Sequence, residues 1–185
     1  TWTRGREPLL VERWREALPL ETFLRTVRPD HPRRVPGTAV FMVPNSDIVP
    51  PALLHNLKHN KVLHERVVLM KIETEDIPHV ADEQRVAVTH LEHNFHTVTL
   101  RYGFMDEPNI PRALAQMRLM QFRINLLETS FFVGREKIVC ASGSHNLWNW
   151  RKRLFIFLQR TMLNATEYFS IPGNRVVELG GQIEI

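Results

Sequence analysis

The sequence predicts an α/β fold with a mixed β-sheet that has a βαβ start, two β-hairpins and flanking helices, plus an N-terminal helical arm. Three observations lead to this prediction. Two apolar runs of strand length flank a helical segment between residues 35 and 75. Two further stretches alternate around short turn sequences, as hairpins do. The first 34 residues are instead rich in arginine and proline and carry a helical stripe.

Residues 1–34 are expected to form an arm in front of the α/β domain, which is expected to span residues 35–185. Leu10, Trp14 and Leu18 recur at helical spacing, and a second short helix is expected over 20–27. Two interpretations stay open. The arm is either an amphipathic helix packed on its own domain, or a juxtamembrane segment whose arginines lie at a cytoplasmic membrane surface.

The domain is expected to open with a strand, a helix and a strand. Residues 37–43 (GTAVFMV) and 65–75 (ERVVLMKIETE) are rich in β-branched and apolar residues, which is typical of buried strands. Pro50 and Pro51 suit the start of a helix, which is expected to end near Asn60. Consecutive strands joined in this way lie parallel in one sheet.

The second half is expected to add two hairpins, two helices and a last strand. Residues 84–104 alternate around His93-Asn94, and residues 129–140 (TSFFVGREKIVC) alternate around the turn sequence at Gly134. A helix is expected to begin at Pro111 with Leu114, Met117 and Gln121 on one stripe, and a longer one over 147–165. The strand over 175–184 is expected to join the same sheet, with a bulge or bend at Gly180 and Gly181.

Composition narrows the classes of function. The net charge of +4 is too small to indicate nucleic-acid binding, and no RNA-binding sequence motif is present. The single cysteine, Cys140, cannot form an intrachain disulfide, which fits a reducing compartment. No apolar run is long enough to cross a bilayer. The chain begins without a methionine, and we expect it to be a piece of a longer protein.

The segment 50–64 concentrates the polar residues that first suggest a site. On a helical wheel that starts at Leu53, His55 and His59 fall at about 200° and 240°, away from the leucines. Asn56 and Asn60 fall on the rim, and Asn60 is a candidate left-handed cap. A metal site is disfavoured because Lys58 lies beside the two imidazoles and the glutamate of the zinc-protease pattern is missing. A solvated helix face and a ligand-contacting or partner-contacting surface remain.

Elsewhere the sequence offers little for catalysis. No nucleotide-binding glycine loop and no nucleophile motif is present, and no pair of carboxylates has a recognisable geometry. No catalytic residue, resident cofactor or metal is therefore expected. Arg151 falls inside the apolar arc of the helix expected over 147–165. It is either an arginine that extends to solvent or one that pairs with a buried acid or a bound anion.

The quoted stretches carry a family resemblance. The chain resembles the C-terminal cytosolic domain of bacterial Kup/HAK/KT potassium uptake transporters, in the order of the family and over nearly its whole length. The matching segments are RVPGTAVFMV (34–43), VPPALLHNLKHNKVLHERVVLMKIETED (49–76), VTLRYGFMDEPNIPRAL (98–114), TSFFVGRE (129–136) and IPGNRVVELGGQIEI (171–185). The region around Arg151 resembles the family less closely.

The resemblance implies several properties. That family imports K⁺, generally with protons, through a membrane domain whose ion-coordinating residues have no counterpart in this chain. The domain is then expected to lie at the cytoplasmic face of the cell membrane, joined to a transmembrane domain of the same polypeptide. Relatives are dimers, and some bind cyclic di-AMP, but no dinucleotide-contacting motif can be matched to residues here.

The sequence therefore predicts a cytosolic regulatory and dimerisation domain, not an enzyme. The alternatives are a nucleotide-binding sensor module for cyclic di-AMP or an adenine nucleotide, a nucleotide-handling enzyme, and a passive structural tail. A pH-sensing role for the nine histidines is a further hypothesis. The candidate interaction or ligand surface comprises His55, Asn56, His59, Asn60, Lys61, His64 and Arg151.

Overall fold

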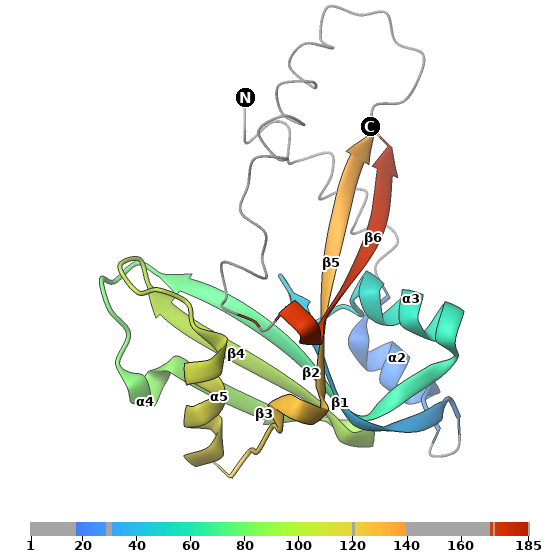
Figure 1. Cartoon of the computed structure of the whole chain (residues 1–185), viewed down its shortest axis with the longest axis horizontal. Helices are drawn as coiled ribbons and strands as arrows, with labels where there is room; N and C mark the ends of the chain where they lie inside the picture. Colours follow the sequence, from blue (N-terminus) through green and yellow to red (C-terminus); the bar gives the residue numbers. More distant parts are fainter. Residues whose placement is uncertain (1–17, 29–30, 120, 140–170, 172, 185) are drawn as a thin grey trace, which may run out of the picture.

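The computed structural model describes residues 18–28, 31–119, 121–139, 171 and 173–184 (Figure 1). Six strands form one mixed sheet in the order β3-β4-β2-β1-β5-β6, and only β3 runs antiparallel to its neighbour. The strands are β1 (Arg33–Val43), β2 (Val62–Glu75), β3 (Val86–His90), β4 (Phe95–Gly103), β5 (Thr129–Val139) and β6 (Val176–Glu184). The predicted α/β class with a mixed sheet and flanking helices is confirmed.

The helices lie between the strands or before them. They are α2 (Leu20–Thr26), α3 (Pro51–Asn60), the single turn α4 (Asp82–Arg85) and α5 (Ile110–Leu119), with 3₁₀ turns η1 (Glu92–Asn94), η2 (Leu126–Glu128) and η3 (Gly173–Arg175). The predicted parallel βαβ start is confirmed, because β1 and β2 pair in parallel on either side of α3 in the chain. None of the described helices is long and apolar enough to cross a membrane.

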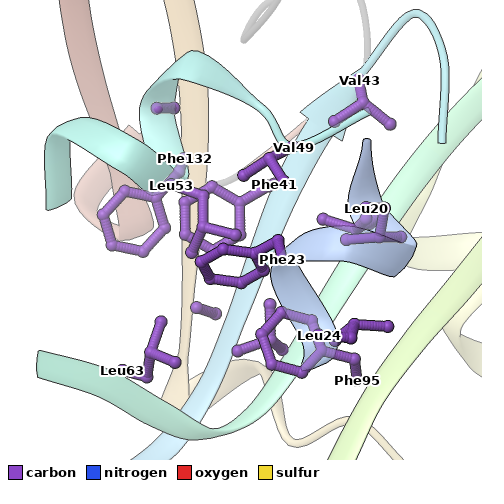
Figure 2. Packing of buried hydrophobic residues seen from close by; sticks show 14 of the residues in the cluster. Leu20, Phe23, Leu24, Phe41, Val43, Val49, Leu53, Leu63, Phe95 and Phe132 are labelled. Atoms are coloured by element: carbon purple, nitrogen blue, oxygen red, sulfur yellow. The ribbon is translucent and has the colours of Figure 1, made fainter. Parts of the chain in front are cut away.

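Each face of the sheet buries a separate apolar core. On one face, α2 and α3 cover alternate residues of the central strands, with Phe41 stacked on Phe132 and Phe23 edge-on to Phe95 (Figure 2). On the other face, α5 packs Ile110, Leu114 and Met117 against the remaining strand residues. Because β2 is covered on both faces, its consecutive residues Val67 to Met70 are all wholly buried. Such a strand has a continuous apolar sequence and not an alternating one.

The first predicted hairpin is confirmed, and the second is wrong. Strands β3 and β4 pair antiparallel with His90 opposite His96. Residues 129–139, however, form the single strand β5, with Gly134 in its middle and not in a turn. The turn sequence around Gly134 is overridden because β5 finds a parallel partner in β6 along nine residue pairs, from Phe131↔Val176 to Val139↔Glu184.

Strand β5 extends well past the body of the sheet. It pairs with β1 only from Thr129 to Phe132, so its later part pairs with β6 as a two-stranded ribbon (Figure 1). The last strand thus joins the sheet as predicted. Of the bulge or bend predicted at Gly180 and Gly181, the bulge is wrong, because the pairing with β5 runs through both glycines without a shift.

The irregularity of the sheet lies instead in β1. Its pairing with β2 shifts between Val35 and Thr38. Gly37 has φ +99°, a conformation that side chains disfavour, and a Cβ there would lie 2.7 Å from the carbonyl oxygen of Glu128. The glycine lets β1 and η2 approach closely.

Two further predictions concern helices. The helix that was expected from Pro111 begins at Ile110 and buries Leu114 and Met117, but it ends at Leu119. Gln121 is exposed with φ 63°, so its place on the apolar stripe is wrong. The arm residues before Leu18, Cys140, and the helix expected over 147–165 lie outside the described residues.

Candidate interaction surface

Helix α3 owes its limits to its first and last residues. Pro50 lies before the first turn and Pro51 occupies it, where a missing N–H leaves no hydrogen bond unmade. The helix ends because Lys61 takes the left-handed conformation, with φ 56° and ψ 27°, and donates its backbone N–H to the carbonyl of Leu57. The prediction of Asn60 as the left-handed cap is wrong by one residue, since Asn60 is still helical.

Four of the predicted residues share an exposed surface. The side chains of His55, His59, Asn60 and Lys61 are all exposed, from the middle of α3 to the residue that ends it. The imidazole rings of His55 and His59 have centroids 5.8 Å apart and planes tilted by 30°. The prediction that both histidines point away from the core is therefore confirmed. These four residues are called the α3 surface below.

Asn56 is not part of that surface, contrary to its predicted place on the rim. It is 4% exposed, donates to the carbonyl oxygen of Val62 at 3.1 Å, and accepts from the Asn60 amide at 2.8 Å. The wheel based on the leucines misplaced the core because it left out Ala52. The helix buries Ala52, Leu53 and Asn56 and leaves Leu54 and Leu57 half-buried.

His64 also belongs mainly to the fold. Its ring packs edge-on against Phe132 with centroids 5.8 Å apart, and its carbonyl oxygen accepts from Arg34. Burial lowers the pKa of His64, because a charged imidazole loses solvation there. The neutral ring is thus an extension of the core. Arg151 lies outside the described residues, so neither of its two interpretations is tested.

The exposed histidines of α3 and its buried Asn56 should differ in their contribution to stability. Replacing His55 and His59 together with alanine should change the free energy of unfolding by no more than about 0.5 kcal/mol, because both are exposed. Asn56→Ala should lower it by about 1–3 kcal/mol, since the Val62 carbonyl loses its donor in a buried place. Urea unfolding of the two variants measures both values. A double histidine variant less stable than Asn56→Ala would contradict this placement.

A second group of histidines, which the sequence patterns did not indicate, lies at the tip of the β3–β4 hairpin. The Nδ1 atoms of His90 and His96 lie 2.9 Å apart, and His96 Nε2 lies 3.1 Å from the carbonyl oxygen of the Asn94 amide. The Asn94 amide nitrogen donates to the Glu65 carbonyl, so His96 Nε2 must be the donor to Asn94. His96 Nδ1 then accepts from His90. The pair could have been predicted from the hairpin, because a turn around His93 places His90 opposite His96.

His96 is held neutral by its surroundings. The ring is 7% exposed and meets the edge or face of Phe122 with centroids 4.9 Å apart, and Phe122 in turn lies under the guanidinium of Arg66. Burial, and then the positive charges of His90 and Arg66, lower the pKa of His96 to about 4. Protonation at mildly acidic pH therefore opposes folding.

The histidine pair makes stability depend on pH. An unfolded histidine titrates near 6.5, so the unfolded chain takes up a proton on His96 before the folded one does. Stability should be full above pH 6.5 and fall as the pH drops, by about 1 kcal/mol at pH 5.5. Urea unfolding at pH 7.5 and 5.5 measures this. His96→Gln should reduce the difference and His59→Gln should not; equal slopes in both variants would contradict the assignment.

A third cluster lies where β2 and β4 end. The Asp106 carboxylate accepts backbone N–H groups from Val80 at 3.0 Å and from Gly103 at 2.8 Å, and contacts His79 Nδ1 at 2.7 Å. These hydrogen bonds, with the charge of Arg85 nearby, lower the pKa of Asp106 well below its usual range. The carboxylate ties together the turns after the two strands.

The described residues hold little that suggests a cofactor. An open hollow of 480 Å³ lies between α2 and the β3–β4 hairpin, lined by Glu21, Leu24, Arg25, His90, Leu91 and Glu92. The hollow is lined by both acidic and basic side chains, and Arg25 is already paired with Glu21 at 2.6 Å. Within the part of the chain that the structure describes, no three histidine, cysteine or acidic residues are grouped so as to hold a metal ion.

The fold and these clusters define an α/β domain whose polar residues mostly serve its own structure and which presents exposed surfaces at its ends. A family model described as the K⁺ potassium transporter C-terminal domain matches residues 36–185. The chain belongs to this family. No solved structure gave a significant match to the chain.

Relatives agree with the family. The chain is 50% identical to the probable potassium transport system protein Kup 1 of a Bradyrhizobium species, over all of this chain and 30% of that protein. It is 50% identical to the Kup protein of Aromatoleum aromaticum and 48% identical to that of Myxococcus xanthus, over 29% and 28% of those proteins. The chain thus spans less than a third of the length of these relatives.

Proposed function

We propose that this chain is the cytosolic regulatory and dimerisation domain of a potassium uptake transporter that takes up K⁺ together with protons. The family match over residues 36–185 is the observation that supports it. The ion path would lie in a transmembrane domain of the same polypeptide, and this domain would sit at the cytoplasmic face of the membrane. It would perform no transport or enzymatic step of its own.

The clusters of ionisable residues support a role without catalysis. The His90–His96 pair and the Asp106 carboxylate are both engaged with neighbouring groups of the fold. The α3 surface, by contrast, is exposed and free of ion pairs in the described part of the chain, and it is our candidate contact for a partner or a second copy. Such contacts would bias the membrane domain between its states.

A test of this role uses the full-length transporter. The triple change His55→Ala, His59→Ala and Lys61→Ala should alter K⁺ uptake while the amount of protein in the membrane stays the same. Arg118→Ala, an exposed change on α5, is the matched control and should leave uptake unchanged. Unaltered uptake in the triple variant would remove the α3 surface from the proposal.

Dimerisation has its own test. The isolated chain should sediment as a dimer at micromolar concentrations, and the triple change at the α3 surface should shift it towards the monomer. A monomer at every concentration would argue that this domain does not assemble by itself.

One feature of the sheet favours a nucleotide-binding sensor as the second candidate. The chain proceeds from β1 to β2 on one side, and β5 later pairs on the other side of β1. Open α/β sheets bind ligands outside the carboxyl ends of the strands at such a point. Here that place adjoins residues 44–50 and the first turn of α3.

Thermal unfolding with cyclic di-AMP, AMP, ADP and ATP separates the candidates. A ligand that binds only the folded state adds about 2.7 kcal/mol at a hundredfold excess over its dissociation constant, which raises Tm. A shift with one nucleotide would favour the sensor. If none of the four shifts Tm, the sensor is removed, and the remaining choice lies between the regulatory contact and a passive structural tail.

A further inference from the structure

The turns that follow β2 and β4 form a projecting apolar tip. Phe104 and Met105 are 61% and 63% exposed, and Ile77 is 46% exposed. The Phe104 N–H donates to the Ile77 carbonyl at 2.9 Å and the Met105 N–H to the Pro78 carbonyl at 3.0 Å, so the two turns lie side by side. The segment of Ile77, Pro78, Phe104 and Met105 is called the apolar tip below.

Hydrogen bonds and close backbone packing hold the apolar tip in place. The Asp106 carboxylate binds the N–H groups of Val80 and Gly103 across the two turns, and Gly103 packs directly against the backbone of Pro78. The tip also extends past the body of the sheet, because Val43 at the end of β1 pairs with Lys71 while β2 continues to Glu75 (Figure 1). An exposed phenylalanine held in place binds a partner with little loss of conformational freedom.

Free carboxylates surround the tip. The four cations on these strand ends and loops are already paired with acids: Lys71 with Glu73, Arg101 with Glu73 and Glu75, Arg85 with Asp82 and Asp106, and Arg112 with Asp82. Asp76 and Glu107, which flank the tip residues in the chain, are exposed and make no ion pair in the described part of the chain. The tip therefore suits a partner that combines apolar and basic side chains.

The opposite edge of the sheet has more exposed basic residues than exposed acids, which are Glu65, Glu92 and Glu128. Exposed basic residues gather at the amino ends of the parallel strands, at Arg28, Arg33, Lys61, Arg118 and Arg123. A surface of anionic lipid would attract that edge and repel the apolar tip. A bilayer is thus a poor occupant of the tip.

The path of the chain indicates the occupant. Leu18 to Leu20 are hydrogen-bonded to Asp47 and Val49, which follow the carboxyl end of β1. Leu18, the first residue that the structure describes, therefore lies at the same edge of the sheet as the tip. In the relatives, about 70% of the protein lies outside the matched region, and the family description places this domain at the C-terminus.

We infer that the apolar tip is the surface by which this domain docks onto a basic and apolar segment of the preceding part of its own polypeptide. This inference rests on the proposed function for the presence of that part. It differs from the α3 surface, which runs from the middle of α3 to the far end of that helix, near the amino end of β2.

Photocrosslinking in the full-length transporter, kept in its membrane, tests the inference. Phe104→p-benzoylphenylalanine should form crosslinks to peptides that precede this domain. The control is Leu127→p-benzoylphenylalanine, because Leu127 is apolar, 73% exposed and on η2, just before the amino end of β5. It should not form those crosslinks. Crosslinks from Phe104 only to lipid, only to this domain in a second copy, or at the yield of Leu127 would overturn the inference.

Charge reversal sharpens the test. Asp76→Lys with Glu107→Lys should lower the crosslinking yield from position 104 severalfold, whereas Glu65→Lys with Glu128→Lys, two exposed acids elsewhere, should not. Measuring K⁺ uptake in the same membranes separates the two claims. Crosslinks with unchanged uptake would leave the docking contact standing and remove regulation. If the crosslinks are missing but uptake is altered in the α3-surface variant, the docking contact is removed and regulation stands.

Discussion

Phe41→Ala should lower the free energy of unfolding by about 4 kcal/mol, a large part of the stability of a domain of this size. Phe41 is 1% exposed on the central strand β1, and its ring stacks on Phe132 with centroids 4.6 Å apart and planes 16° apart. Removing it leaves a cavity beneath both α2 and α3. Chemical denaturation of the purified chain measures the loss.

Phe104→Ala is the matched control. The same side chain is removed, but from the exposed apolar tip, so the free energy of unfolding should change by no more than about 0.5 kcal/mol. Similar losses in the two variants would contradict the division between a core phenylalanine and a docking phenylalanine. A stable Phe104→Ala also makes any effect on K⁺ uptake a matter of contact and not of folding.

Gly103→Ala should also be strongly destabilising, by about 3 kcal/mol. A Cβ at this position would lie 2.3 Å from the carbonyl oxygen of Pro78 and 2.5 Å from that of Ile77, and backbone atoms must move to admit it. The move would separate the turns that Asp106 ties together. Thermal and urea unfolding measure the loss.

Gly134→Ala provides the comparison within the same sheet. Nothing lies within 4 Å of a Cβ there, and β5 is extended, so alanine should be neutral or raise stability by about 0.5 kcal/mol. If Gly103→Ala were as harmless as Gly134→Ala, the close packing of the tip would be wrong.

The sequence was informative where burial decides structure. The continuous apolar runs predict β1 and β2, and the two prolines predict the start of α3. Each of these signals lies within the residues of the element that it predicts. The turn sequence at Gly134 misled, because a glycine followed by two charged residues is typical of a turn, whereas β5 takes its structure from a strand more than 35 residues later. Long-range pairing of this kind leaves no local pattern.

Only part of the candidate site could be predicted, because some of its residues are placed by neighbours that are distant in the sequence. Exposure of His55 and His59 followed from helical spacing, but the place of Asn56 did not, because the small Ala52 sets which side of α3 meets the sheet. The His90–His96 pair was within reach, since the hairpin around residue 93 places the two opposite each other. The role of Asp106 was not, because its partners come from two turns more than 20 residues apart.

The proposed role of this domain is to regulate potassium uptake from outside the ion path. The most direct measurement is K⁺ uptake by the full-length transporter with residues 36–185 removed, at a known amount of protein in the membrane. We expect the shortened protein to remain in the membrane and still to transport K⁺, at a changed rate. Uptake at the full rate would contradict regulation by this domain, and loss of the protein from the membrane would show instead a passive tail needed for assembly.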